Sequence, residues 1–277
     1  MGRSIFLLGV AVALLVPSAP ALAQSGGTPV PGPGDPCPAS YPGDDADREP
    51  IARWMARGAA LREVPQELPA MAGLAESGLR NLNTKGNPFA GFFSMHRSLN
   101  KGDYRGFPRN PELQLRWFLD TAVIVRQREI AEGEEDFGSS PDGYGVWIAD
   151  VERPTPENRK GYQPYFDDAD ALLTESCRPS DHVADETPPA LRIKAAGRQR
   201  DAVVVTARCP SEPCMVAAQA EPRRRVRAAR AVSADADAVT LTLPVRARRS
   251  VRLVVTVTAV DVAGNASRRT KSVILLR

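Results

Sequence analysis

The sequence has little histidine and carries no nucleophile motif of the serine hydrolases. Its only two histidines, His96 and His182, are too few to build a histidine-based metal cluster. It has no Gly-x-Ser-x-Gly string, in which a sharp turn exposes the nucleophile of α/β-hydrolases. We therefore expect no metal, no cofactor and no serine-hydrolase chemistry.

Long apolar runs are absent except at the N-terminus. Residues 5–16 form a twelve-residue apolar run, and the small residues of Ala21-Leu22-Ala23 follow. This is the layout of a cleavable signal peptide over residues 1–23. A membrane span needs about 20 apolar residues, and no later segment is apolar enough to form one. The mature protein is therefore expected to be secreted, extracellular or cell-wall associated, without a transmembrane anchor.

Cysteine is also scarce, with four residues in the whole chain. In an oxidising compartment, four cysteines form two disulfides more readily than a metal site or a papain-like nucleophile. Three pairings are possible. Cys209 and Cys214 are close in sequence and favour a local pair, which leaves Cys37 and Cys177 to close a large loop worth about 4 to 5 kcal/mol.

Charge and composition divide the 277 residues into two expected domains. Residues 24–44 are rich in glycine and proline and predict a linker, and residues 181–189 form a second break. The net charge is −8 over residues 45–186 and +12 over residues 187–277. Only five of the 36 basic residues are lysine, so the arginine content has a compositional explanation as well as a functional one.

The hydrophobic pattern changes between the two expected domains. Apolar residues recur at helical spacing over residues 45–180, and the longest such run begins at Asn110-Pro111 and extends to about Ile130. Residues 187–277 instead show about seven short alternating runs. The sequence therefore predicts a mainly α-helical domain over 45–180, followed by an all-β sandwich over 187–277.

One acidic residue stands out in the helical part. Glu76 is the only acidic residue between Glu67 and Asp103, and the small residues Ala72 and Gly73 lie one helical turn before it. Apolar surroundings and the negative end of the helix dipole disfavour an ionised carboxylate. Both effects suit a general acid, although a lone glutamate in this position is more often an ordinary surface residue.

The surrounding string resembles the lysozyme-like domain of soluble lytic transglycosylases. It reads Ala-x-x-x-Glu-Ser-Gly-Leu-x-Asn-Leu around Glu76, with Gly-Phe-Phe-Ser-Met at residues 91–95. Residues 110–118 and 147–154 resemble exported relatives of the same family, so the resemblance covers about residues 47–175. It implies a mixed, mainly helical lysozyme-like fold that cleaves peptidoglycan glycan strands.

The resemblance also implies roles for individual residues. Glu76 would be the catalytic acid and base, and Ser77 would orient the substrate or the carboxylate. The implied substrate-binding residues are Ser77, Gly91, Phe92, Phe93, Ser94, Met95, Tyr144 and Trp147. Two departures are notable, because Ser94 stands where the family usually has glutamine and the usual Ala-Tyr-Asn-Ala-Gly string is missing. Tyr144, Trp147 or Tyr162 could replace its tyrosine, and each is equally suited to the core.

The last ninety residues resemble bacterial immunoglobulin-like modules. Such modules end in an Asp-x-Ala-Gly-Asn turn, here residues 261–265, and carry a short Cys-x4-Cys loop. The resemblance implies an immunoglobulin-like sandwich without catalytic residues. Its basic side chains could attract anionic envelope polymers, and nucleic acid is not an expected partner of an exported protein. The basic side chains form two clusters, Arg223, Arg224, Arg225, Arg227 and Arg230, and Arg246, Arg248, Arg249 and Arg252.

Three functions remain open from the sequence. In lytic transglycosylases the 6-hydroxyl of the substrate closes a 1,6-anhydromuramyl end, so that one glutamate is enough. A hydrolytic muramidase would need a second carboxylate, for which Asp103, Asp150 and Glu152 are the candidates. A non-catalytic protein that binds the cell wall is the third alternative.

Overall fold

The computed structural model describes residues 37–199, 202–223, 226, 228–234, 238–246 and 250–275. The expected signal peptide and residues 24–36 of the expected linker lie outside these described residues. Within the described part of the chain, no helix is both long and apolar enough to cross a membrane.

The first part of the chain contains five α-helices and a small antiparallel sheet among the described residues. The elements are α1 Arg48–Ala60, α2 Glu67–Ser77, β1 Phe89–Ala90, β2 Met95–His96, α3 Pro111–Glu132, α4 Tyr144–Glu152 and α5 Phe166–Ala171. Local sequence explains the ends of the longest helix. The Asn110 side chain accepts a hydrogen bond from the Leu113 N–H, Pro111 occupies the first turn, and Gly133 follows the last residue. The predicted start of this helix is confirmed.

Short 3-10 helices connect these elements. They are η1 Arg97–Leu99, η2 Gly102–Tyr104, η3 Phe107–Arg109, η4 Pro141–Gly143, η5 Pro156–Asn158 and η6 Gln163–Tyr165. Four of them, η3, η4, η5 and η6, have proline in the first turn, where its missing N–H needs no partner.

The second part of the chain forms two antiparallel sheets. Their strands are β3 Arg192–Gln199, β4 Ala202–Arg208, β5 Cys214–Glu221, β6 Ala229–Ala234, β7 Val239–Pro244, β8 Val251–Val260 and β9 Ala266–Leu275. One sheet has the order β3-β4-β7 and the other the order β6-β5-β8-β9. Alternate residues of β4, β7 and β8, such as Val203, Leu241 and Val257, enter one hydrophobic cluster that both sheets share.

The predicted fold class is wrong. The described residues form a mixed α/β structure of roughly 36% helix and 25% strand, with nine strands in three antiparallel sheets, and a mainly α-helical first domain is not seen. The error arises between α2 and α3. Residues 78–110 contain many glycine, asparagine and proline residues, and they form the β1–β2 hairpin and three 3-10 helices, a strand content that the mainly helical class did not include.

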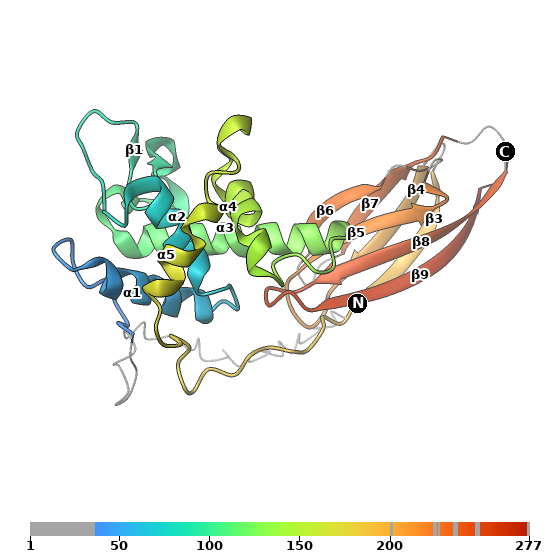
Figure 1. Ribbon diagram of the computed structural model, residues 1–277. Helices are drawn as coiled ribbons and strands as arrows, with labels where there is room; N and C mark the ends of the chain where they lie inside the picture. The colour runs from blue at the N-terminus through green and yellow to red at the C-terminus, as the bar shows by residue number, and fades with distance from the viewer. Residues whose placement is uncertain are drawn as a thin grey trace, which may run out of the picture.

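Helix α3 joins the two parts of the structure (Figure 1). Near its C-terminal end, Ile130 and Ala131 pack against Met215, Ala217 and Val260 of the four-stranded sheet. One turn earlier, the Gln127 Nε2 group donates to the Val260 carbonyl at 3.1 Å. The sheets therefore pack directly on the helix that also supports the helical core.

Arg126 crosses the same junction. Its guanidinium donates to the carbonyls of Glu63, which follows α1, and of Val262, which follows β8. Burial lowers the pKa of Arg126 to about 10, so the side chain stays charged at neutral pH. A buried cation with carbonyl partners on both sides holds the turn after β8 against the helical part.

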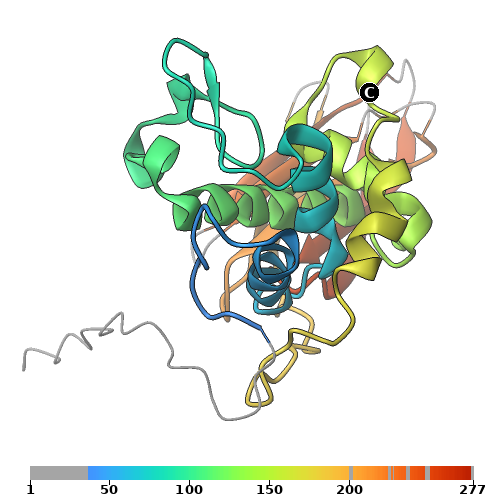
Figure 2. The same ribbon diagram turned by 60° about the vertical axis from the view of Figure 1, so that its left-hand side comes forward.

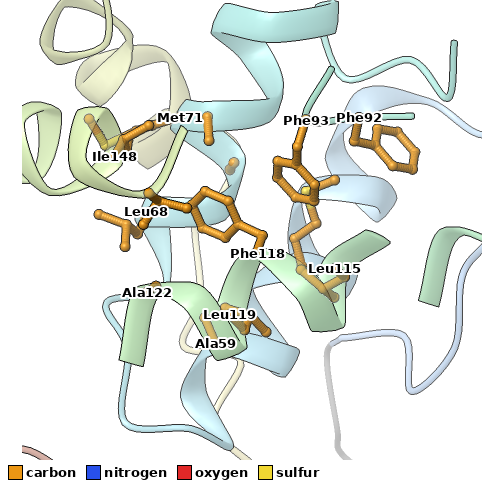
Figure 3. Close-up of a cluster of buried hydrophobic side chains, with 14 of the residues drawn as sticks. Ala59, Leu68, Met71, Phe92, Phe93, Leu115, Phe118, Leu119, Ala122 and Ile148 are labelled. Carbon is orange, nitrogen blue, oxygen red and sulfur yellow. The ribbon is translucent and has the colours of Figure 1, made fainter. Parts of the chain in front are cut away.

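The helical core surrounds α2 and α3 (Figure 3). Leu68 and Met71 of α2 pack with Phe118 of α3 and Ile148 of α4 in one buried cluster. The Phe93 ring stacks on the Phe118 ring with centroids 4.6 Å apart. These contacts fix the segment around Phe93 against α3 and, through Leu68 and Met71, against α2.

Both predicted disulfides are confirmed. Cys37 is bonded to Cys177 across 140 residues, and Cys209 is bonded to Cys214 across five. The first bond connects the segment before α1 to the segment after α5. The second closes the connection between β4 and β5.

We predict that the double substitution Cys37→Ser and Cys177→Ser lowers the free energy of unfolding by about 4 to 5 kcal/mol, because the unfolded chain gains the entropy of a long open loop. Denaturant unfolding under non-reducing conditions measures the change. The matched Cys209→Ser and Cys214→Ser double substitution opens a much shorter loop and should cost less. Equal losses in the two variants would contradict the loop-entropy explanation.

Candidate active site around Glu76

Glu76 occupies the penultimate position of α2 and is half-buried. The helix ends because Gly78 adopts the left-handed conformation, with φ of 64°. The Leu79 N–H then donates to the Gly73 carbonyl at 2.9 Å, and the Leu79 side chain is buried. This cap holds the carboxylate of Glu76 at the negative end of a short, rigid helix.

The turn between β1 and β2 is bonded to the same end of α2. The Ser77 hydroxyl donates to the Phe92 carbonyl at 2.8 Å, and the Ser94 hydroxyl donates to the Glu76 carbonyl at 3.3 Å. Figure 2 shows the β1–β2 segment on one side of this helix end and the segment after α4 on the other. The structure therefore brings together the two strings, around Glu76 and over residues 91–95, that the sequence separates.

A buried glutamine of α3 holds this turn in place. Gln114 Oε1 accepts from the Phe92 N–H at 3.0 Å, and its Nε2 donates to the Phe107 carbonyl at 2.9 Å and to Asn81 Oδ1 at 3.0 Å. A Cβ atom on Gly91 would lie 2.5 Å from the Gln114 carboxamide, and Gly91 has φ of 84°. Glycine is thus required at this position for two reasons. Sequence reasoning placed Gln114 in a motif but missed this role.

Tyr162 is the aromatic residue that reaches Glu76. Its hydroxyl donates to Glu76 Oε1 at 2.7 Å, and its side chain is buried. Burial raises the pKa of Tyr162, and the bond to Glu76 raises it further, so the phenol stays protonated and remains a donor. Of the three aromatic candidates from the sequence, the structure brings this one to the carboxylate.

The other two aromatic candidates belong to the core. The Trp147 indole N–H donates to the Ala122 carbonyl at 3.0 Å, and its ring packs on Phe137. The Tyr144 ring contacts the Phe166 ring at its edge. Both side chains are buried, and these contacts account for them without a substrate.

Residues 91–95 are mostly buried as well. The side chains of Phe92, Phe93 and Met95 lie in the hydrophobic core, whereas Ser94 is half-buried with φ of 45°. A substrate at this turn would meet its backbone and Ser94 rather than the aromatic rings. The pattern Gly-Phe-Phe-Ser-Met thus describes a packed turn that supports the end of α2.

A second carboxyl group lies near Glu76. Glu152 is the last residue of α4, which packs against α2, and its Oε1 atom is buried without a hydrogen-bond partner. Part of the residue reaches the surface, whereas its Oε1 atom is enclosed. Burial raises the pKa of Glu152 well above that of an ordinary carboxyl, and the nearby Glu76 raises it further.

The remaining candidate carboxylates and histidines have other surroundings. Asp150 forms an ion pair with Arg159 at 2.5 Å, and Asp103 is exposed in η2. His96 is exposed and accepts from the Ser98 N–H, and His182 pairs with Glu63 at 2.6 Å.

One trio of carboxylates among the described residues could hold a metal ion. Ligand atoms of Asp185, Glu212 and Asp261 lie within 4.8 Å of one another. The Asp261 carboxylate already accepts from the backbone N–H and the side-chain amide of Asn265. The trio lies beside the sheets and includes no residue of the Glu76 site. Of the two arginine clusters, Arg224, Arg225, Arg227, Arg248 and Arg249 lie outside the described residues.

We predict that Gln114→Leu lowers the free energy of unfolding by about 2 to 6 kcal/mol, because the Phe92 N–H and the Phe107 carbonyl lose their partners and each such buried group costs about 1 to 3 kcal/mol. Urea unfolding measures the loss. Arg116→Leu is the control, since Arg116 is exposed on the same helix and should change stability by less than about 1 kcal/mol. A stable Gln114→Leu variant would show that the turn does not depend on this side chain.

The resemblance to soluble lytic transglycosylases rests on the residues of the chain alone. No model of a known protein family matches this chain, and no curated protein matches it.

Proposed function

We propose that this protein cleaves the glycan strands of peptidoglycan, with Glu76 as the catalytic acid and base. The observation that carries the proposal is the hydrogen bond from the buried Tyr162 hydroxyl to Glu76 Oε1. It orients a half-buried carboxyl at a rigid helix end, as a general acid requires. The resemblance around Glu76 supplies the substrate class, a glycosidic bond next to a muramic acid residue.

In the first step, the Glu76 carboxylic acid gives its proton to the glycosidic oxygen as the bond from that oxygen to C1 breaks. The departing sugar leaves as an alcohol, and positive charge develops on the muramic ring. The Tyr162 hydroxyl keeps its hydrogen bond to the carboxylate that Glu76 becomes. A charge-assisted hydrogen bond of this kind stabilises the ionised carboxylate and fixes its direction.

In the second step, Glu76 acts as a base. Its carboxylate takes the proton from the 6-hydroxyl of the same muramic residue, whose oxygen attacks C1 and closes a 1,6-anhydro ring. Glu76 is then protonated again, and no water is consumed. A single carboxyl group therefore serves both steps.

The surroundings of the other carboxylates support this route over hydrolysis. A hydrolase needs an ionised second carboxylate as base or nucleophile, about 5 to 9 Å from the acid. Glu152 is near Glu76, but burial raises its pKa, which disfavours the ionised form that a base or nucleophile requires. Asp150 is engaged by Arg159, and Asp103 is an exposed residue of η2.

Export to an oxidising compartment is part of the proposal. The two disulfides are compatible with such a location. The N-terminal residues 1–23 have the layout of a secretory signal and lie outside the described residues. Secretion would bring the mature chain to its polymeric substrate.

A non-catalytic role in binding the cell wall is the second candidate. It is favoured by the Ser94 hydroxyl, which donates to the Glu76 carbonyl at the position where the family usually has glutamine. The sugar contacts of that glutamine would then be missing. Release of soluble fragments from purified peptidoglycan distinguishes the enzyme from the binding protein.

We predict that Glu76→Gln slows fragment release by about 100-fold or more, because general acid catalysis contributes about 10²- to 10⁴-fold. The melting temperature should stay close to that of the wild type, since the amide can still accept the Tyr162 hydrogen bond. Glu67→Gln makes the same chemical change at the start of α2 and serves as the control. Clearing of peptidoglycan by Glu76→Gln at the wild-type rate would rule out the role of Glu76.

The products test the second step. We predict fragments with 1,6-anhydromuramyl ends, which are lighter by one water than the products of hydrolysis, because the 6-hydroxyl replaces water as the nucleophile. Mass spectrometry of the released fragments measures the difference. Reducing muramic acid ends alone would establish a hydrolase, and the Asp103→Asn, Asp150→Asn and Glu152→Gln variants would then identify its second carboxylate.

A further inference from the structure

The mechanism proposed above leaves the Glu152 carboxyl unexplained. Its Oε1 atom is buried without a hydrogen-bond partner, which costs stability, and a carboxyl group is especially costly to enclose. Of the described residues whose buried polar side-chain atoms lack a partner, Glu152 is the only acidic one. Such a residue next to a candidate catalytic acid is better explained by function than by packing.

The charged and titratable groups around Glu152 come from several elements. Glu76 approaches from α2, and Tyr162, next to η6, feels the charge of both carboxyl groups. On α4 itself, Asp150 is paired with Arg159. On α3, the Arg126 guanidinium lies 5.8 Å from the centre of the Trp147 ring of α4, and its pKa responds to Asp261 and Glu63.

Arg153, which follows Glu152 and caps α4, is exposed. Within the ranges that the structure describes, no hydrogen bond or ion pair joins a cation to the Glu152 carboxyl. Nothing there compensates a negative charge on this group. A charge on Glu152 would therefore be repelled by a charge on Glu76 without compensation.

Two helix ends increase this repulsion. Glu76 is the penultimate residue of α2 and Glu152 is the last residue of α4, so each carboxyl lies at the negative end of its helix. Two carboxylates in this place would repel each other as well as the helix dipoles. The surroundings therefore favour a single negative charge on the carboxyl pair, with the Tyr162 hydroxyl as hydrogen-bond donor to Glu76 and the other carboxyl group neutral.

We propose that Glu152 is a positioning residue that stays uncharged and forms a carboxyl pair with Glu76, so that the site carries at most one negative charge during catalysis. This inference rests on the proposed function. When Glu76 has given its proton to the leaving group, the neutral Glu152 acid stabilises the new carboxylate from the side of α4, and the Tyr162 hydroxyl does so from the other. The Oε1 atom of Glu152 is buried without a partner that could compensate a charge, and this burial raises the pKa of the group.

The pair has a consequence for stability. Because the pKa of Glu152 is raised in the folded protein, the folded state keeps a proton that the unfolded chain releases above its ordinary value of 4.5. The stability that depends on Glu152 is therefore fully present below pH 4.5 and is lost as the pH rises toward the folded pKa. A glutamine at this position cannot ionise and removes this dependence.

Three variants of the full chain test the proposal. Glu152→Gln keeps a neutral hydrogen-bond donor, Glu152→Leu removes the donor, and Glu157→Gln changes an exposed residue beyond α4 as a control. For each, the rate of fragment release from peptidoglycan is measured across pH, and the melting temperature is measured at pH 4 and pH 8.

We expect Glu152→Gln to retain the rate within about threefold, with the alkaline limb of the pH profile in the wild-type position, because one neutral group replaces another. Glu152→Leu should lose about tenfold or more, and its alkaline limb should move to higher pH, because the Glu76 carboxylate loses a stabilising neighbour. Glu152→Gln should melt at a higher temperature than the wild type at pH 8 and at nearly the same temperature at pH 4.

Several results would overturn the proposal. In Glu152→Gln, the alkaline limb of the pH–rate profile could move to lower pH, or the folded variant could lack activity. Either result would mean that Glu152 is ionised in the wild type. A Glu152→Leu variant with the wild-type profile would mean that the residue is only structural. If Glu152→Leu does not fold, the pH–rate profile of Glu152→Gln still shows whether Glu152 is ionised in the wild type.

Failure of the proposed function gives a different result. A wild type that releases no fragments at any pH overturns that function and the positioning role with it. The melting temperatures then decide separately whether Glu152 is uncharged. If the melting temperature of Glu152→Gln at pH 8 is no higher than that of the wild type, Glu152 is not uncharged in the folded protein.

Discussion

The arrangement around Glu76 depends on the buried carboxamide of Gln114. This one side chain satisfies the Phe92 N–H and the Phe107 carbonyl, and it fills the space that a side chain on Gly91 would need. The turn held in this way presents its carbonyl to Ser77 and its hydroxyl to the end of α2. The end of α2 that carries Glu76 is thus held from α3 through a chain of hydrogen bonds.

The electrostatics of the site follow from the C-terminal ends of α2 and α4, where no described cation is bonded to either catalytic-site carboxyl group. Helices α2 and α4 each place a carboxyl group at a negative end. Among the described residues, Glu76 accepts a hydrogen bond from a phenol, whereas the Oε1 atom of Glu152 has no hydrogen-bond partner. Two negative charges in this site would repel each other and raise its electrostatic free energy, so the site is better suited to one. A developing positive charge on a sugar ring is the kind of species that this surrounding would stabilise.

The sheets are coupled to this site through α3. The same helix carries Gln114 near its start and Ile130 near its end, where it packs on the four-stranded sheet. The Arg126 guanidinium binds carbonyls from both parts of the structure. Because α3 packs both in the helical core and on the four-stranded sheet, side-chain packing sets the position of the sheets relative to Glu76.

The sequence by itself determined the features that depend on neighbours along the chain. Asn110-Pro111 begins α3 and the alternation of Leu253, Val255 and Val257 buries one face of β8, because caps and strand periods are local properties. The place of Glu76 at a helix end was also readable from the Glu-Ser-Gly string. The disulfides followed from the closeness of Cys209 to Cys214, which left one other pair.

Only the tertiary structure decided the features that depend on distant residues. The mixed α/β fold class, the burial of Phe92 and Phe93, and the choice of Tyr162 over Tyr144 and Trp147 were not fixed by any local pattern. Tyr162 lies 86 residues after Glu76, and its hydroxyl meets the carboxylate only because α4 and η6 pack beside α2. The raised pKa of Glu152 has the same origin, because desolvation is a property of the folded surroundings and not of the sequence next to a residue.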